Sequence, residues 1–189
     1  MLEHPNHVLA ISTVRVSGTR TRTRRGGPII CIGTLSVERA TDAEARFATT
    51  HVLFDPGEDW RAPGAHVRCL LHPHSYALGC SARIRTRDGR VRRSGPASYE
   101  ELPGTAHLPP LQRHVIWARE ETLADLARES GLRVSMQPED LLQAKREAAD
   151  RAQAIWIMAL GFVRNTEERT QLYAAWQAWS ALQQAAVPF

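Results

Sequence analysis

The sequence VLAISTVRV at Val8–Val16, followed by IICIGTLSV at Ile29–Val37, decides the predicted fold. Both runs are rich in β-branched residues, which fit the pleated, half-buried surface of a sheet, and both therefore predict strands. Between them, Ser17-Gly18 and Gly26-Gly27-Pro28 interrupt regular structure. The opening of the chain thus predicts β structure.

Further segments of the first half also predict strands. Arg46–Phe54 and His66–Leu71 are short runs of this kind, and Ala82–Arg87 leads through Asp88-Gly89 into Arg90–Arg93. Because Asp-Gly readily adopts the positive φ angles of a tight two-residue turn, this last segment predicts a β-hairpin. Short strands separated by turn signals predict a small antiparallel barrel or sandwich.

Proline and glycine are dense at residues 95–110, which predicts a connecting segment and a boundary. We expect a β-rich, basic domain at residues 1–98 and a mainly helical region at residues 99–189, which is an α+β organisation. Arg113–Ala118 fits a strand or a helix equally well. Glu120–Ser130 predicts a short amphipathic helix that Gly131 ends.

Two longer helices are predicted at the end of the chain. Pro138 suits the first turn of one, and Asn165 with Glu168 three residues later resembles a capping box that opens the other. Their apolar stripes are Leu141, Ala144, Ala148, Ala152, Ile155 and Ala159, and Leu172, Ala175, Trp176, Trp179, Leu182 and Ala186. We expect an antiparallel helix hairpin in which alanine leaves room for tryptophan. The first helix is apolar on more than one face at Trp156 and Met158, so the β-rich part, another copy or another protein must cover it.

Composition excludes several classes of protein. With 189 residues, of which 43% are hydrophobic and 23% charged, the chain is long enough for one globular domain or two small ones. Its longest apolar run, Ile155–Val163, is far shorter than the roughly 20 residues of a membrane span. The first residues lack the regions of a signal peptide, and three cysteines are too few for a disulfide framework, so we expect a cytoplasmic protein. Because nucleophile-elbow, phosphate-loop, GxGxxG and HExxH motifs are missing from the sequence, we expect neither an enzyme nor a bound cofactor.

Charge is divided unevenly along the chain. Residues 1–98 hold 15 arginines against 8 acidic residues, a net charge of +7, whereas residues 99–189 carry a net charge of −3. Arginine outnumbers lysine by 23 to 1. A guanidinium group can bind a phosphate through two parallel hydrogen bonds, and clustered cations release counterions when they meet a polyanion. The division of charge therefore indicates a polyanionic partner.

The arginines form two clusters. One occupies the polar segment Ser17–Gly27, and the other occupies the predicted hairpin. Their members are Arg20, Arg22, Arg24 and Arg25, and Arg83, Arg85, Arg87, Arg90, Arg92 and Arg93. By period-2 alternation the odd positions from 83 to 87 share one strand face, and we expect Arg90 and Arg92 to join them across the turn. A solvated surface is the alternative interpretation.

Aromatic residues are scarce in the basic half. Phe47 and Phe54 suit the core, which leaves Trp60 and Tyr76 as candidates for stacking on bases. We therefore expect contacts to the phosphate backbone rather than to the bases. We predict a non-enzymatic protein that binds DNA or RNA through phosphate contacts, as a subunit or accessory of a larger nucleoprotein complex. In this hypothesis the C-terminal helices dock other protein subunits.

Two alternatives compete with this prediction. The first is a structural or assembly protein, such as a subunit of a phage particle or of a homo-oligomeric ring, because opposite charges on the two halves also suit head-to-tail association. The second is a zinc protein, because Cys69, His72, His74 and Cys80 are possible ligands within a short stretch. Their spacing is not that of a familiar zinc finger or ribbon. Buried cysteines and a polar loop explain them equally well, so we assign no metal ligand.

Overall fold

The computed structural model describes residues 5–15, 29–40, 44–55, 59, 61–85, 91–93, 102–118, 120–134 and 141–185. Its strands are β1 (His7–Arg15), β2 (Ile29–Arg39), β3 (Ala45–Leu53), β4 (Ser75–Arg85), β5 (Val91–Arg93) and β6 (Arg113–Ala118). Its helices are α1 (Ala62–Leu70), α2 (Glu120–Glu129), α3 (Leu141–Leu160) and α4 (Thr166–Ala185), with a short 3-10 turn, η2, at Pro110–Gln112. The predicted first, second and third strands are confirmed to within two residues at either end.

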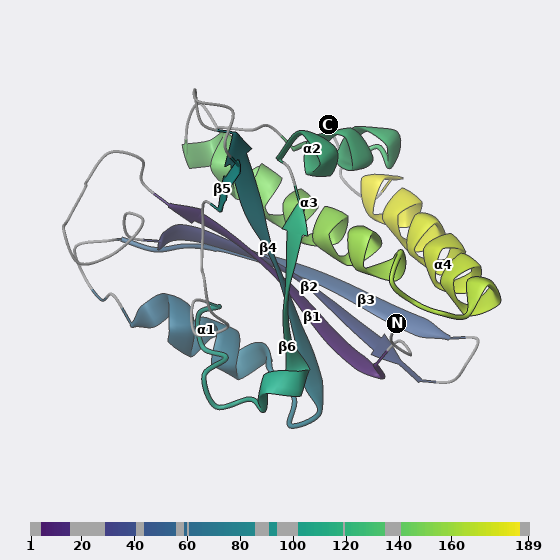
Figure 1. Cartoon of the computed structure of the whole chain (residues 1–189), viewed down its shortest axis with the longest axis horizontal. Coiled ribbons are helices and arrows are strands. Elements are labelled where there is room, and N and C mark those ends of the chain that lie inside the picture. The colour runs from purple at the N-terminus through teal and green to yellow at the C-terminus, as the bar shows by residue number, and fades with distance from the viewer. Residues whose placement is uncertain are drawn as a thin grey trace.

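The strands form one open, mixed sheet in the order β3-β2-β1-β4, with β6 beside β4 (Figure 1). β1, β2 and β3 are antiparallel neighbours, whereas β4 is parallel to β1 and β6 is parallel to β4. The end of β4 pairs antiparallel with β5, as the hairpin signal predicts. The α+β class is confirmed. The antiparallel barrel is wrong, because the β1–β4 and β4–β6 pairings are parallel and the sheet does not close.

The predicted strand at His66–Leu71 is also wrong, because most of this segment belongs to α1. Pro63 lies in the first turn of α1, where a missing N–H leaves no hydrogen bond unmade, and both Pro63 and Val67 are buried. Their spacing of four residues is that of one helix face. As a helix, the segment carries the chain across the sheet from β3 to a strand parallel to β1. The misassigned segment therefore accounts for the parallel pairing of β1 with β4, which an antiparallel barrel does not contain.

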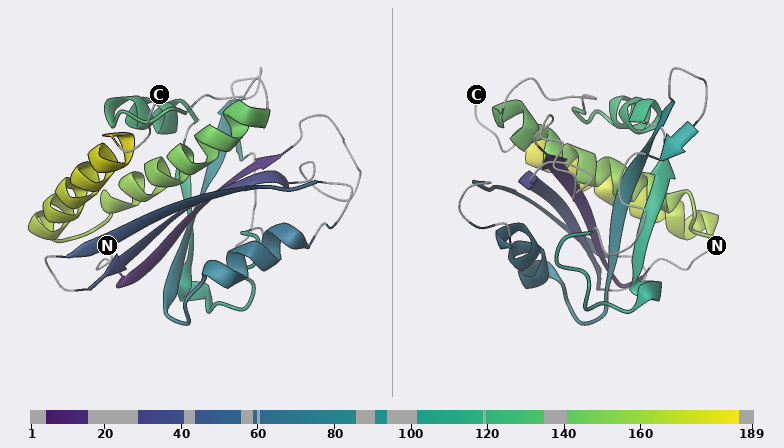
Figure 2. Two further views of the ribbon diagram at one scale, coloured as in Figure 1. Left: turned by 180° about the vertical axis from the view of Figure 1, so that it is seen from behind. Right: turned by 60° about the vertical axis from the view of Figure 1, so that its left-hand side comes forward.

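α3 lies across one face of the sheet, with α2 and α4 beside it (Figures 1 and 2). Gly33 of β2 permits this close approach, since a Cβ atom there would lie 2.1 Å from the backbone of Ala148. The core between these layers buries Trp156 and Trp176, and Phe47 meets the Trp156 ring edge-on at 5.5 Å. The sheet, α2 and α4 thus cover the apolar faces of α3 within the chain.

The opposite face of the sheet is covered by α1 and the segment at residues 102–108. Val67 and Leu102 pack there with Ile32 in a second core cluster. Gly104 has a φ of +73°, and a Cβ atom on it would lie 2.2 Å from the carbonyl oxygen of Gly64, so the segment crosses α1 backbone to backbone. The sheet therefore lies between two helical layers.

Both parts of the chain build this sheet. β6 comes from beyond residue 98 and lies beside β4, and α3 packs on β1 and β2. The division at residue 98 remains one of charge and composition.

α2 ends as the sequence predicts. Gly131 has a φ of +72°, and the N–H of Leu132 donates to the carbonyl oxygen of Ala127 at 2.8 Å, which closes the helix in the usual C-terminal motif. Pro138, expected at the start of the next helix, lies outside the described residues. Among the helices that the structure describes, none is long and apolar enough to cross a membrane.

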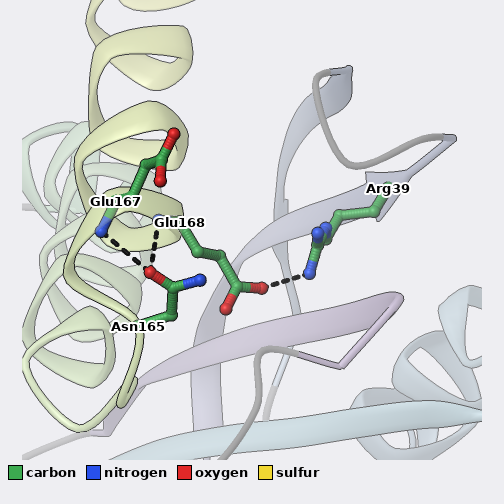
Figure 3. A network of polar contacts seen from close by, with 4 residues as sticks. All are labelled: Arg39, Asn165, Glu167 and Glu168. Atoms are coloured by element: carbon green, nitrogen blue, oxygen red, sulfur yellow. Dashed lines mark hydrogen bonds and ion pairs between the residues drawn. The ribbon is translucent and has the colours of Figure 1, made fainter.

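Asn165 caps α4, as expected. Its Oδ1 accepts hydrogen bonds from the backbone N–H groups of Glu167 at 3.0 Å and Glu168 at 3.3 Å (Figure 3). In a capping box the Glu168 carboxylate would turn back toward Asn165, but here it accepts from Arg39 of β2. The side chains of this ion pair are only 11% and 15% exposed. The pair therefore ties the start of α4 to the end of β2.

Candidate nucleic-acid interface

Parallel pairing of β1 with β4 brings the C-terminal ends of these strands to the same end of the sheet. β1 ends there at Arg15, and β4 ends there at Arg85. Figures 1 and 2 show that α3 begins near this end as well. We call this region the arginine end of the sheet.

The register of β4 and β5 orders the arginines at this end. Arg83 is paired with Arg93, and the next position pairs Ile84 with Arg92. The register therefore places Arg83 and Arg93 at one paired position and Arg92 at the next. Seven further candidates lie outside the described residues: Arg20, Arg22, Arg24, Arg25, Arg87, Arg90 and Trp60.

The first part of β4 packs against the layer formed by α1 and residues 102–108. Ala77 belongs to the core cluster on that side, and Gly79 approaches Leu102 of the same layer.

The predicted site did not include Arg15 or Trp117, whose positions the strand pairings fix. Arg15 is the last residue of β1 and is paired with Ile29, beyond a shift in register after Val14. Trp117 of β6 is paired with Ser81 of β4. The signal for Arg15 was its place at the end of a predicted strand, whereas Trp117 is placed only by pairing with a distant strand.

The structure places Tyr76 away from the arginine end. Tyr76 lies near the start of β4, nine residues before Arg85, which corresponds to roughly 30 Å along a strand. Its ring stacks on His114 at 6.4 Å, and it packs against the core on the α3 side. Burial lowers the pKa of His114. Tyr76 and the arginine positions of β4 therefore do not form one groove.

Two carboxylates lie in the first half of α3. Glu147 is buried and accepts a hydrogen bond from Nε2 of Gln143 at 2.7 Å. Asp150 accepts from the backbone N–H of Arg133 at 2.9 Å and from Nε2 of Gln153 at 3.3 Å. Burial raises the pKa of Asp150, although the hydrogen bond and the charge of Arg133 act in the opposite direction. The hydrogen bonds of Asp150 join α3 to the segment that follows α2.

The raised pKa of Asp150 predicts a pH-dependent stability. A carboxyl group whose pKa is higher in the folded than in the unfolded chain destabilises the fold when it is ionised. The penalty is absent below the unfolded pKa and complete once the pH has risen through the folded pKa. Asp150→Asn is therefore expected to gain stability relative to the wild type as the pH rises from about 3 to about 7.

Urea unfolding of both proteins across this pH range measures the difference. Asparagine has one acceptor oxygen where the carboxylate has two, so the variant also loses a hydrogen bond at every pH. The slope of the difference with pH, rather than its absolute value, is therefore the test. A flat or falling difference would contradict the prediction.

The four candidate zinc ligands lie in different local structures. Cys69 is exposed near the end of α1, His72 and His74 lie in the connection to β4, and Cys80 lies within β4. The ring of His72 stacks on His7 at 4.6 Å. Among the described residues, no group of three or more His, Cys, Asp or Glu side chains is placed to hold a metal ion.

Comparison of the chain with protein-family models, with curated proteins and with solved structures found no match. The placement of the residues therefore has to support any proposal about function. The feature with a chemical meaning is the arginine end of the sheet, to which β1, β4 and β5 contribute arginine positions.

Proposed function

We propose that this protein is a non-enzymatic nucleic-acid-binding protein that holds phosphate groups at the arginine end of its sheet. The supporting observation is the parallel pairing of β1 with β4, which brings Arg15, Arg83 and Arg85 to one end. Arg93 joins them through its pairing with Arg83. In the sequence, the segment with Arg20, Arg22, Arg24 and Arg25 directly follows β1. Guanidinium groups are suited to phosphates, and this concentration favours binding over catalysis.

We further propose that the protein acts in the cytoplasm, as a subunit or accessory of a nucleoprotein complex. Three cysteines, Cys31, Cys69 and Cys80, are too few for a disulfide framework, which suits a reducing compartment. Trp156 and Trp176 are buried in the core, so a docking surface for other proteins on the C-terminal helices has to use other residues. Leu182 of α4, with 70% of its surface exposed, is one such residue.

The test is the salt dependence of oligonucleotide binding. Fluorescence anisotropy of a labelled oligonucleotide is measured between about 50 and about 200 mM salt, where a protein with six or more phosphate contacts loses roughly a thousandfold in affinity. Replacing Arg20, Arg22, Arg24 and Arg25 with alanine is expected to flatten the plot of log affinity against log salt, by about one unit for each lost contact. An Arg83→Ala/Arg93→Ala variant is expected to act in the same direction.

The matched control removes arginines elsewhere. Arg128 and Arg164 are exposed and lie at the end of α2 and beyond the end of α3, so their replacement with alanine is expected to leave the slope unchanged. Failure to bind at about 50 mM salt, or affinity independent of salt, would overturn the proposal. Light scattering of the protein alone tests the assembly alternative, which requires discrete rings or larger particles without nucleic acid.

A further inference from the structure

β3 forms one edge of the sheet and presents backbone hydrogen-bonding groups on its outer side. The N–H of Phe54 donates to the carbonyl oxygen of Ile30, and the N–H of Ala40 donates to that of Glu44. Hydrogen-bonded and non-hydrogen-bonded pairs alternate along an antiparallel ladder, so the register makes the even-numbered residues of β3 bond to β2. The odd-numbered residues therefore direct their N–H and C=O groups away from the sheet.

The outer side of β3 is exposed. Within the part of the chain that the structure describes, no hydrogen bond reaches the backbone groups of Phe47 or Thr49 on this side. Of the nine residues of β3, none is buried and four are exposed, whereas more than half of β2 is buried. The backbone groups of this edge are therefore accessible to another strand.

β3 lacks the features that usually protect an edge strand. Such strands avoid pairing with another chain through short length, proline, a bulge or charged side chains. β3 has nine residues, contains neither proline nor glycine, and pairs with β2 in an unbroken register. Among Asp, Glu, Lys and Arg, it contains a single residue, Arg46, near one end. A long, regular edge of this kind is a template for a further strand.

A second copy of β3 fits this edge. With Thr49 opposite Thr49 of the second copy, all nine residues pair, and the outward N–H and C=O groups of one strand meet those of the other. Arg46 then lies opposite Val52, so the two arginines do not face each other. Shifting the register by two residues in either direction leaves residues at the strand ends unpaired.

α4, which lies beside this edge, carries no charge that would oppose a second copy. The rings of Trp179 in α4 and Phe47 in β3 are 5.6 Å apart. From Thr170 to Ala185, α4 contains no charged residue. Pairing about a two-fold axis would place α4 of both copies on the same face of the joined sheet. β3 and this part of α4 offer a polyanion only Arg46, but they offer a second copy a surface almost without like charges.

We propose that the protein forms a two-fold symmetric dimer in which the β3 strands of two copies pair antiparallel, centred on Thr49, and join the two sheets into one. Because each copy uses its β3 edge for the other, this contact ends at two copies and differs from the head-to-tail ring of the assembly alternative. The inference is independent of the proposed function, because no candidate phosphate-binding residue lies in β3.

The first test measures molecular mass by light scattering, in protein free of nucleic acid, at about 1 to about 100 μM. The variants are Thr49→Pro and Thr49→Val. Proline is tolerated where the N–H of an edge strand faces outward, so Thr49→Pro removes a donor from the proposed interface but none from the β2 ladder. The wild type and Thr49→Val are expected to have twice the chain mass of 21.1 kDa, and Thr49→Pro the mass of one chain. Thermal melting shows whether each variant is folded.

The second test is disulfide cross-linking. Across a hydrogen-bonded antiparallel pair the Cα atoms are about 5.5 Å apart, which suits a disulfide, so Thr49→Cys is expected to form a covalent dimer on mild oxidation. Ala48→Cys is the matched control, because its copies lie diagonally at about 7–8 Å and are expected to link poorly. The wild type is oxidised in parallel, since Cys69 is exposed.

Three results would overturn the inference. One is a wild type that is monomeric at about 100 μM, or that forms particles larger than a dimer. Another is a folded Thr49→Pro variant that remains dimeric. The third is cross-linking of Ala48→Cys, or of the wild type, as efficient as that of Thr49→Cys. If Thr49→Pro does not fold, the cross-linking decides.

Discussion

Gly33→Ala is expected to destabilise the protein by about 3 kcal/mol or more, at or above the upper end of the usual cost of an overpacked core. An added Cβ atom would lie 2.1 Å from both the carbonyl carbon and the carbonyl oxygen of Ala148, and 2.5 Å from the backbone nitrogen of Ala149. These are backbone atoms, so rotation of a side chain cannot relieve the clash. α3 would have to move away from β2, which would open the core that buries Trp156.

Urea unfolding followed by tryptophan fluorescence measures this loss. The control is Gly161→Ala, just beyond the end of α3, where an added Cβ atom meets only the carbonyl oxygen of Met158, at 3.2 Å. That variant is expected to stay within about 1 kcal/mol of the wild type. A Gly33→Ala protein as stable as the wild type would show that α3 does not lie on β2 at this position.

Trp176→Ala is expected to lower the free energy of unfolding by about 3–5 kcal/mol, as is usual when a buried aromatic side chain is removed. Trp176 is 1% exposed, and its Nε1 donates to Oε1 of Gln153 at 3.0 Å. The substitution therefore leaves a cavity and also deprives a buried amide of its donor. Since this contact joins α4 to α3, α4 should lose its protection from amide hydrogen exchange before the sheet does.

Leu182→Ala is the matched control on the same helix. Leu182 is 70% exposed, and its replacement is expected to change the free energy of unfolding by less than about 0.5 kcal/mol. Trp176→Phe separates the two contributions, because it keeps most of the buried area but removes the donor to Gln153. Equal stability of Trp176→Ala and the wild type would contradict the placement of α4 on α3.

Local sequence signals predicted those elements whose ends and faces depend on nearby residues. The β-branched runs marked β1 and β2, Gly131 marked the end of α2, and Asn165 marked the start of α4. In each case the residue acts on its own turn or strand, through a steric preference or a cap within three residues. The Glu168 carboxylate was the exception, because Arg39, far away in sequence, competes successfully for it.

Prediction from the sequence failed where the secondary structure of a segment depends on contacts with residues far away in the sequence. The segment containing Val67 forms α1, and its helical form sends the chain to a parallel strand instead of the next antiparallel one. The sequence of Arg113–Ala118 fits a helix or a strand, because its apolar residues suit both. The segment forms a strand because it pairs with β4.

By itself, the sequence determined that the chain is α+β, that its positive charge is concentrated in the first half, and where several strands and helices begin and end. These properties follow from composition and from interactions between residues close together in the chain. Only the tertiary structure decided that the sheet is open and mixed, and that β1 and β4 end with Arg15 and Arg85 at the same end of it. The physical reason is that strand direction and register are set by hydrogen bonds between segments many residues apart. The loop-closure entropy that this pairing costs and the free energy that it gains depend on both segments, so neither segment alone predicts them.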